Sequence, residues 1–471
     1  MTKEILPTDD TIAAIATALG PGGIGIVRLS GPRSVEIADQ IFQSRSGKKV
    51  SRFKSHTVHY GNVFDPRPKQ DRSGGIIDEA LVTVMAAPQS YTCEDVVEIS
   101  SHGGLMAVKT ILELVIDLGA RLAQPGEFTK RAFLNGRLDL VQAEAVLDII
   151  QAKTKAFLKV STHQLKGDLT LELEKIREDL MEAYTQLEAL VNFPEDGLED
   201  RGRAEIGSRL LKAKGKIRSL LSESEQGRLL REGVKVVLCG RPNVGKSSLL
   251  NVLLKQPRAI VSEVAGTTRD TIEEPAQIRG IPIQLVDTAG LLEPRDLIEE
   301  EAVKRSRIHM QNADLVLLIL SAHEKLTEED FRIIKFLEGQ NTLVVVNKSD
   351  LPNSLADDEI VNVLPGKTIV RVSARTKAAI SRLEDAIEEN VLAGHCVDPA
   401  NILLTNTRHT GSLKNALTSV EEAAASLADN LSLEFISEHL KAGVNALDRI
   451  TGRDIDVDLL DNIFSSFCIG K

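Results

Sequence analysis

The fold is decided by the stretch Gly240-Arg241-Pro242-Asn243-Val244-Gly245-Lys246-Ser247-Ser248. An apolar, β-branched run at residues 234–239 precedes it, and a leucine-rich run at residues 249–254 follows it. The pattern G-x-x-x-x-G-K-S between a predicted strand and a predicted helix is typical of a loop that binds phosphate groups. Glycines let backbone N–H groups approach phosphate oxygens, and the helix start adds the positive end of its dipole. We predict that Lys246 reaches the β- and γ-phosphates of a nucleotide and that the Ser247 hydroxyl holds Mg²⁺.

Strand-like and helix-like stretches alternate around this loop, from about residue 231 to residue 392. Alternation of this kind predicts a mainly parallel sheet with helices on both faces. Ligands bind such sheets at the carboxyl ends of the strands, and each motif described below lies at or beyond a predicted strand end. The predicted strands are residues 234–239, 283–287, 315–320, 343–347 and 369–373.

Two motifs after later strands are predicted to recognise the base. Asn347-Lys348-Ser349-Asp350 lies at the end of the fourth predicted strand. The Asp350 carboxylate can accept hydrogen bonds from the N1–H and 2-amino groups of guanine, which adenine does not offer, so this motif favours GTP over ATP. Asn347 is predicted to bind the O6/N7 side of guanine and to tie the motif to the phosphate loop. Ser373-Ala374-Arg375, after the last strand, can place a backbone N–H on guanine O6.

Two loops are predicted to complete the contacts with GTP and Mg²⁺. Asp287-Thr288-Ala289-Gly290 can hold the Mg²⁺ shell and meet the γ-phosphate, although a capped turn suits this tetrapeptide equally well. Gly266-Thr267-Thr268-Arg269-Asp270 lies where the first switch of a GTPase belongs; Thr268 is the chosen second Mg²⁺ ligand and Thr267 its rival, with an ordinary polar loop as the alternative. The predicted GTP-binding residues are Asn243, Val244, Gly245, Lys246, Ser247, Ser248, Thr267, Thr268, Asp287, Gly290, Asn347, Lys348, Asp350, Ser373 and Ala374.

The order of these motifs closely resembles that of the translation-factor-like GTPases, with one departure at Leu291. A Ras-type GTPase has glutamine directly after D-x-x-G, where it orients the attacking water. Leucine cannot do this, so either hydrolysis is negligible or another residue supplies the function. An acidic run follows at residues 296–301, although charge runs are usually solvated faces.

The flanking regions predict a multidomain chain in which an N-terminal α+β domain precedes an all-α region that is interrupted by the nucleotide-binding domain. Residues 25–29, 80–85 and 95–99 are predicted strands, and residues 108–118 a helix. No proline lies between Pro125 and Pro194 or after Pro399, and the apolar residues there follow helical spacing. One split helical domain is the economical interpretation, and two unrelated helical segments are the alternative. The predicted domains are residues 1–129, 130–230 with 394–471, and 231–393.

Composition predicts a folded, soluble protein. The chain has 471 residues, of which 42% are hydrophobic, and its net charge of −11 argues against a broad cationic surface while allowing a local basic patch. The first ten residues contain no apolar core of a signal peptide, and no apolar run is long enough to span a membrane. The four cysteines show neither metal-type spacing nor a disulfide framework, so we expect the cytoplasm. The absence of tryptophan argues against an aromatic platform for bases.

Along nearly its whole length the sequence resembles the MnmE family, also called TrmE, of tRNA uridine-modification GTPases. The nested nucleotide domain, the phosphate loop and Gly266-Thr267-Thr268-Arg269-Asp270 carry this resemblance. So do Pro125-Gly126-Glu127-Phe128, Arg131-Ala132-Phe133-Leu134-Asn135 and Phe464-Ser465-Ser466-Phe467-Cys468-Ile469-Gly470-Lys471. On composition alone, the last of these stretches predicts a frayed apolar tail.

The resemblance implies a reaction and a set of partners. It implies a homodimer, formed through a folate-binding N-terminal domain, and a heterotetramer with MnmG, a flavoprotein that uses FAD and NADH. Together they add an aminomethyl or carboxymethylaminomethyl group at C5 of the wobble uridine of certain tRNAs. The implied cofactor is a tetrahydrofolate derivative, 5,10-methylene- or 5-formyl-tetrahydrofolate. Methylene-tetrahydrofolate supplies the one-carbon unit, and glycine or ammonium supplies the nitrogen.

The resemblance also implies further site residues. Folate contacts map to Arg28, Glu98, Arg137 and Lys471, although without the resemblance a strand-surface ion pair and a solvated terminus would explain three of them. GTP hydrolysis would depend on K⁺ and on Glu299, with Glu300 and Glu301 adjoining it. Cys468 would be a reactive thiol, or else a small hydrophobic residue. The implied K⁺ ligands are Asn243, Ser262, Val264 and Thr267.

Two other functions stay open from the sequence. An RNA- or ribosome-associated GTPase switch would share the nucleotide domain, but it commonly adds a recognisable RNA-binding module, which this sequence lacks. A scaffold with a dead nucleotide site conflicts with the intact nucleotide motifs.

Overall fold

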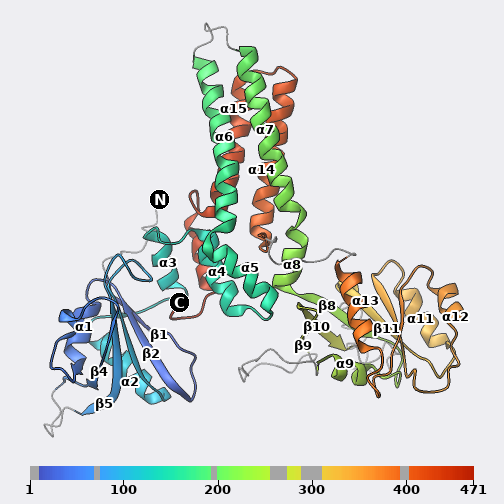
Figure 1. Ribbon diagram of the computed structural model, residues 1–471, viewed down its shortest axis with the longest axis horizontal. Coiled ribbons are helices and arrows are strands. Elements are labelled where there is room, and N and C mark those ends of the chain that lie inside the picture. The colour runs from blue at the N-terminus through green and yellow to red at the C-terminus, as the bar shows by residue number, and fades with distance from the viewer. Residues whose placement is uncertain (1–9, 68–74, 193–198, 255–272, 288–309, 393–402) are drawn as a thin grey trace. The chain divides into compact units, whose positions relative to one another are not determined.

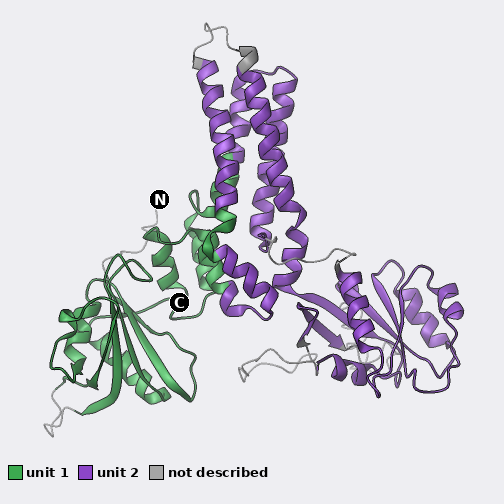
Figure 2. Ribbon diagram, viewed as in Figure 1, with its two compact units in different colours: residues 1–147, 165–170, 444–471 green, residues 148–164, 171–443 purple. Residues whose placement is uncertain are grey.

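The computed structural model describes residues 10–67, 75–192, 199–254, 273–287, 310–392 and 403–471. The chain forms two compact units (Figure 2). Unit 1 comprises Met1–Leu147, Leu165–Thr170 and Val444–Lys471, and unit 2 comprises Asp148–Gln164 and Leu171–Gly443. Each unit therefore draws on separate stretches of the sequence.

Unit 1 is built on a seven-stranded sheet in the order β3-β4-β5-β6-β2-β1-β7 (Figure 1). All pairs in it are antiparallel except the one between β1 and β7. The three strands predicted for this region overlap β2, β5 and β6, and the predicted helix overlaps α2. The strands are Ile12–Ile15 (β1), Gly22–Ser30 (β2), Phe42–Ser44 (β3), Thr57–Phe64 (β4), Ile76–Met85 (β5), Val96–Gly103 (β6) and Arg121–Leu122 (β7).

Helices cover one face of this sheet. The helices α1 (Ser34–Ile41) and α2 (Leu105–Asp117) bury their apolar residues against alternate residues of β2, β5 and β6. A third helix, α3 (Glu127–Leu134), follows β7 and buries Phe128. The alternation along the strands leaves Arg28 and Glu98 half-buried on the face that α1 and α2 do not cover.

The C-terminal segment is part of unit 1, so the frayed tail predicted from composition is wrong. Phe464 and Phe467, at and after the end of α16 (Val457–Ser465), are buried with Leu140 and Phe133. Gly470 lies so close to β1 that a Cβ atom there would come 2.4 Å from the Ile15 carbonyl oxygen. Its φ of +94° also requires glycine. These contacts fix the last residues beside the N-terminal sheet.

Long helices precede and follow the second sheet in the sequence, and most of their residues belong to unit 2, although residues 140–147, 165–170 and 444–451 belong to unit 1. Their buried residues recur at three- and four-residue spacing, as in Ile206, Leu210, Ala213 and Ile217. Helix α7 precedes the second sheet in the sequence and packs along α14, which follows that sheet. The sheet therefore interrupts a helical region, as predicted. The helices are Leu140–Gln151 (α4), Lys155–Lys166 (α5), Asp168–Asn192 (α6), Glu199–Ser222 (α7), Ser224–Glu232 (α8), Thr407–Ala428 (α14) and Leu433–Thr451 (α15).

The second sheet has six strands in the order β13-β12-β11-β8-β10-β9. All neighbours are parallel except β9 and β10, which form an antiparallel hairpin that the sequence did not predict. Helices α9 and α13 pack on one face, and α11 and α12 on the other, as predicted. The elements are Val234–Cys239 (β8), Lys246–Leu254 (α9), Glu273–Ile278 (β9), Ile281–Asp287 (β10), Leu315–Ser321 (β11), Glu328–Phe336 (α11), Thr342–Asn347 (β12), Asp357–Val363 (α12), Ile369–Arg371 (β13) and Ile380–Leu392 (α13).

Candidate functional site

The phosphate loop joins β8 to α9, in the strand–loop–helix context that its sequence predicts. Gly240 and Gly245 have φ values of +145° and +96°, and Asn243 has a φ of +64°. A Cβ atom at Gly245 would lie 2.3 Å from Asn347 Nδ2, so glycine is required there by space as well as by conformation. Lys246 Nζ donates to the carbonyl oxygens of Gly240 and Arg241, at 2.8 and 2.9 Å, and so spans the loop.

Asn347 joins the phosphate loop to the base motifs. Its side chain is 2% exposed, Nδ2 donates to the Val244 carbonyl at 2.9 Å, and Oδ1 accepts from the Ala374 N–H at 3.0 Å. The tie between motifs that the sequence predicts is therefore present. Since both ends of this amide have protein partners, a direct contact between Asn347 and guanine stays a prediction.

Asp350 is an exposed carboxylate at the same edge of the sheet. The Ser373 hydroxyl donates to its Oδ1 at 2.6 Å, and the Thr376 N–H donates to that hydroxyl at 3.1 Å. The hydrogen bond from Ser373 lowers the pKa of the Asp350 carboxyl below its ordinary value. Asp350 is thus an ionised acceptor at neutral pH, which suits a base edge that presents only donors.

Arg241, within the phosphate loop, belongs to a contact that the sequence did not predict. Its guanidinium forms an ion pair with Glu324, and its Nε lies 3.6 Å from Asp330 Oδ2. Asp330 also forms the capping box of α11 with Thr327. The loop is thereby linked to the start of a helix on one face of the sheet. The sequence signal for this contact was a cation, Arg241, at a position where the phosphate-loop motif allows any residue.

Several predicted residues lie outside the described part of the chain. Asp287 ends β10, but its side chain is not described. Ser247 and Ser248 lie in the first turn of α9, and Lys348 has a φ of +64° in the turn before Asp350. The predicted residues outside the described ranges are Ser262, Val264, Thr267, Thr268, Gly290 and Glu299, together with Leu291.

Two of the four predicted folate contacts, Arg28 and Arg137, lie beside one tyrosine of unit 1, and Glu98 contacts Arg28. Arg28 and Glu98 face each other across β2 and β6, and Arg28 Nε lies 2.8 Å from Glu98 Oε1, so the ion pair considered from the sequence exists. Arg28 also donates to the carbonyl oxygen of Gly470, beside Lys471, at 3.2 Å. Its guanidinium carbon lies 5.7 Å from the centroid of the Tyr91 ring.

Arg137 approaches the same tyrosine. Its guanidinium carbon lies 4.8 Å from the ring centroid, and it donates to the Tyr91 carbonyl at 3.0 Å. Tyr91, Arg137, Cys93 and Asn135 line an open cavity of about 720 Å³. The sequence did not predict Tyr91, because a single tyrosine in a turn-rich stretch carries no distinctive signal.

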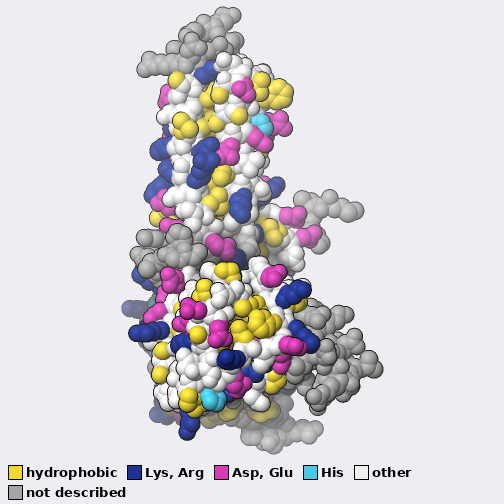
Figure 3. Space-filling model, turned by 90° about the vertical axis from the view of Figure 1, so that its right-hand side faces the viewer, with side chains coloured by type: hydrophobic (Ala, Val, Ile, Leu, Met, Phe, Trp, Pro, Cys, Tyr) yellow, Lys and Arg dark blue, Asp and Glu magenta, His cyan; other side chains and the backbone are white. Residues whose placement is uncertain are grey.

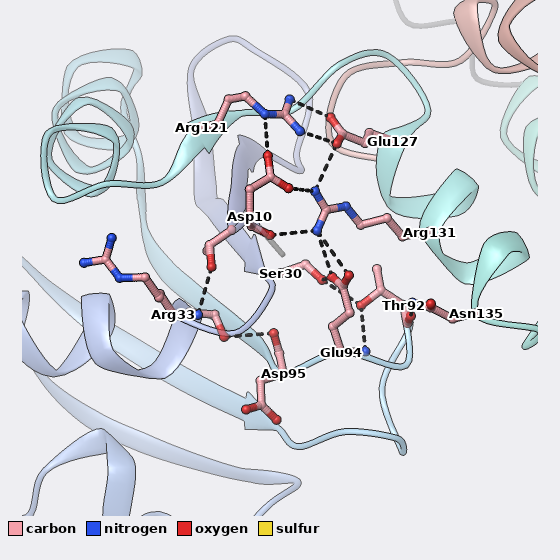
Figure 4. Close-up of polar contacts among 12 residues, drawn as sticks. Asp10, Ser30, Arg33, Thr92, Glu94, Asp95, Arg121, Glu127, Arg131 and Asn135 are labelled. Atoms are coloured by element: carbon pink, nitrogen blue, oxygen red, sulfur yellow. Dashed lines mark hydrogen bonds and ion pairs between the residues drawn. The ribbon is translucent and has the colours of Figure 1, made fainter. Parts of the chain in front are cut away.

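A buried charge network contacts the loop that lines part of this cavity (Figure 4). Arg131, on α3, is 3% exposed and contacts Asp10, Glu94 and Glu127. Burial raises the pKa of Glu127. Hydrogen bonds from Arg121, the Gln124 N–H and Arg131 lower the pKa by more than burial raises it, so the net shift is downward. Because Glu94 lies three residues after Tyr91, the network fixes the loop that carries Tyr91 against α3.

Cys468 is exposed, and both its role as a reactive thiol and the alternative of a small hydrophobic residue stay predictions. Its carbonyl oxygen accepts from the Gly126 N–H at 3.4 Å, which holds the C-terminal segment beside the start of α3. Among the described residues, no helix combines the length and the apolar character needed to cross a membrane.

A parallel sheet flanked by helices, a phosphate loop after its first strand and a carboxylate poised for guanine define a P-loop GTPase domain. This domain interrupts a helical region that follows an α+β domain.

Comparisons with known proteins name the family. A family model described as "MnmE helical domain" matches residues 140–468, and one described as "GTP-binding protein TrmE N-terminus" matches residues 11–137. Proteins called "tRNA modification GTPase MnmE" from Alkaliphilus oremlandii, Geobacillus kaustophilus and Bacillus subtilis are 44%, 43% and 42% identical over 463 residues. These matches cover 98% of this chain and 99%, 99% and 100% of the relatives. The chain belongs to the MnmE family and, with its nucleotide motifs, is a GTPase of that family.

Proposed function

We propose that this chain couples GTP hydrolysis to modification of the wobble uridine of certain tRNAs, as a homodimer that works in the cytoplasm with the flavoprotein MnmG. The relatives' shared name, tRNA modification GTPase, supports the reaction class. One structural observation supports the nucleotide: Asn347 bridges the phosphate loop and the Ala374 backbone, beside the ionised Asp350. This arrangement suits a ligand with phosphates at one end and guanine at the other.

The residues present suit a magnesium nucleotide. Gly245 leaves no room for a side chain, as a loop that wraps phosphate requires, and Lys246 and Ser247 begin α9. Ser247 and Thr268 would hold Mg²⁺, which neutralises charge on the phosphates when it is bound. On nucleotide binding, Lys246 would exchange the carbonyl oxygens of Gly240 and Arg241 for phosphate oxygens.

We further propose that hydrolysis depends on K⁺ and Glu299. Leu291 offers no polar group to the attacking water, so another residue must orient it. The side-chain oxygen of Asn243 and oxygens of Ser262, Val264 and Thr267 form a neutral oxygen donor set, which suits K⁺ rather than a transition metal. A cation there stabilises charge that develops on the transferring phosphoryl group.

The test is GTP hydrolysis by the full chain in KCl and in NaCl, with two matched variants. We expect faster hydrolysis in KCl. Glu299→Ala should keep GTP affinity and lose most of the hydrolysis rate, because only the transition state needs the oriented water. Glu300→Ala removes an adjacent carboxylate and should keep the rate. An inactive Glu300→Ala beside an active Glu299→Ala would overturn the assignment of Glu299. Equal hydrolysis rates in the two salts would exclude a role for K⁺.

We propose that the cluster around Tyr91 binds a tetrahydrofolate derivative. Two guanidinium groups suit the glutamate carboxylates of a folate, while Glu98 can accept from a pterin ring and Tyr91 can stack on it. The open cavity beside Tyr91 and Arg137 gives such a ligand room. Lys471 would add a fourth polar contact from the C-terminal segment.

Equilibrium dialysis with 5-formyl-tetrahydrofolate tests this cluster. Arg137→Ala should weaken binding by about tenfold or more, since it removes a charge-assisted hydrogen bond. Arg33→Ala, at an exposed ion pair with Glu36, is the control and should bind normally. Equal affinity of the two variants would contradict the proposal.

Cys468 is the proposed reactive thiol, and its exposure supports access by a reagent or substrate. Alkylation of Cys468 should abolish tRNA modification while leaving GTP hydrolysis intact. Full modification by the alkylated protein would exclude this thiol from the reaction.

A further inference from the structure

Helix α7 carries a cationic stretch that the proposed chemistry does not use. Residues 206–222 contain five Lys or Arg residues and no Asp or Glu, in a chain whose net charge is −11. The buried face of α7 carries Ile206, Leu210, Ala213 and Ile217, so the cations lie on its sides and its exposed face. The five cations are Arg209, Lys212, Lys214, Lys216 and Arg218.

Four of these cations form two rows, and each row shares a single acid. On the side of α6, Lys212 and Lys216 contact Asp179 at 2.9 and 2.6 Å. On the side of α14, Lys214 and Arg218 contact Glu421 at 3.1 and 2.6 Å. In each row, two cations contact a single carboxylate, so the cations outnumber the acid that they contact by one.

One cation of each row remains accessible despite these contacts, whereas the side chains of Lys214 and Lys216 are only 28% exposed. The side chains of Lys212 and Arg218 are 62% and 60% exposed. Ion pairs at such exposure contribute little to stability, so their cations can turn to another anion at small cost. Figure 3 shows several Lys and Arg side chains on the long helices, with Asp and Glu side chains among them.

The crest between the rows carries mostly small residues, with the exposed Leu211 among them. Ser208, Gly215 and Ser219 are exposed, and no atom lies within 4 Å of a Cβ atom built at Gly215. Within each row the two cations are four residues apart, which corresponds to about 6 Å along the helix. An extended anion can therefore approach the helix between two parallel rows of donors. We call this surface, formed by residues 208–219 of α7, the α7 ridge.

We infer that the α7 ridge binds the phosphate backbone of the tRNA, an inference that rests on the proposed function. Backbone contacts are made mainly by flexible cations and need no base recognition, which fits a surface without an aromatic residue. A protein interface of similar size draws its affinity from buried aromatic or apolar anchors. The ridge offers only Leu211 for that purpose, so an RNA backbone is the better occupant.

The test uses a variant that removes charge while keeping each acid paired. In Lys212→Gln with Arg218→Gln, Asp179 keeps Lys216 and Glu421 keeps Lys214, so the helices should pack as before. An unmodified tRNA transcript is titrated into the full chain over a salt series, with fluorescence anisotropy as the readout. Lys335→Gln with Arg382→Gln, on α11 and α13, removes the same charges from exposed positions elsewhere and is the matched control.

The plot of log affinity against log salt has a negative slope. We expect this slope to be shallower by about 1.5 in the ridge variant and unchanged in the control. At 0.1 M salt the affinity should fall by about tenfold or more. Equal thermal unfolding midpoints of the two variants would establish that folding is not the cause.

Three results would overturn the inference, and they differ in what else they remove. A native slope in the ridge variant would exclude the ridge and leave the proposed function intact. No tRNA binding by the native chain, alone or with its flavoprotein partner, would remove the proposed function as well. Native tRNA affinity with lost binding of the flavoprotein would make the ridge a protein interface.

Discussion

Asp350 shows at the residue scale how a small contact prepares a site for one base. The Ser373 hydroxyl holds one carboxylate oxygen and lowers the pKa of the group, while the side chain stays exposed. An ionised carboxylate has acceptors only, so it matches the two donors on the guanine edge and mismatches adenine. We therefore expect base selection to depend on the charge of this one side chain.

Asp350→Asn should exchange the preferred nucleotide. The amide replaces an acceptor by a donor, which faces the 2-amino donor of guanine but matches the 2-oxo acceptor of xanthine. We expect GTP affinity to fall by about 100-fold or more and affinity for xanthosine triphosphate to rise. Fluorescence titration with both nucleotides measures this. Asp357→Asn, at an exposed acid on α12 that contacts Arg371, should bind GTP normally; an unchanged GTP affinity in Asp350→Asn would contradict the role of Asp350.

Residue-scale prediction from the sequence succeeded where a motif states its own chemistry. The loop glycines and the tie through Asn347 are present as predicted, because the spacing of G-x-x-x-x-G-K-S and N-K-x-D already implies their neighbours. Tyr91 and Arg241 were missed, since their partners come from distant parts of the chain. The contacts of a lone side chain depend on tertiary structure, which local pattern does not encode.

At the scale of elements, α3 depends on a buried charge network rather than on apolar packing alone. Arg131 contacts three acids, and Glu127 is 1% exposed. Breaking a buried network leaves uncompensated charge in a medium that solvates it poorly. The network thus couples the position of α3 to the loop of Tyr91.

Arg131→Met should destabilise unit 1 by about 3–5 kcal/mol, because it leaves Glu94 without its cation and Glu127 with Arg121 as its one remaining cation. Hydrogen exchange of the amides of α3 and β6 reports this as a lower free energy of opening. Arg33→Met removes an exposed cation of the same unit, directly before α1, and should change protection little. Native protection in Arg131→Met would show that the network contributes nothing to stability.

The same network predicts acid sensitivity. Burial raises the pKa values of Asp10 and Glu127, but hydrogen bonds from Arg121 and Arg131 lower them more, to below their ordinary values of 3.8 and 4.5. A lowered pKa in the folded state means that this stability is complete above the ordinary values and is lost as pH falls through the folded ones. After equilibration at each pH, deuterium labelling at one fixed pH should show α3 losing protection below about pH 4.5. Retained protection of α3 far below both ordinary values would contradict this.

Element prediction was best for long periodic stretches. The parallel strands and the helices after residue 140 follow the apolar pattern closely, because burial of one face imposes that pattern. The hairpin strand β9 was missed. The break between α7 and α8 at Glu223 was also missed, because no glycine or proline marks it.

At the scale of the whole molecule, the sequence order and the spatial units differ. The C-terminal residues return to unit 1, where Gly470 lies against β1 and near Arg28. The net charge of the whole chain, −11, also gives no indication of the cationic α7 ridge. Composition averages over the chain, so it could predict neither a buried C-terminal segment nor a local charge of opposite sign.

Mass spectrometry of wobble uridines in tRNA from cells that lack this gene tests directly whether this chain modifies tRNA. We expect that the 5-substituted uridine disappears, that it returns on expression of the native chain, and that Lys246→Ala and Asp350→Asn fail to restore it. Lys335→Gln, at an exposed position on α11, should restore it fully. Unchanged wobble uridines in cells without the gene would contradict the proposed function. The chain would then be a GTPase whose partner is the ribosome or another RNA.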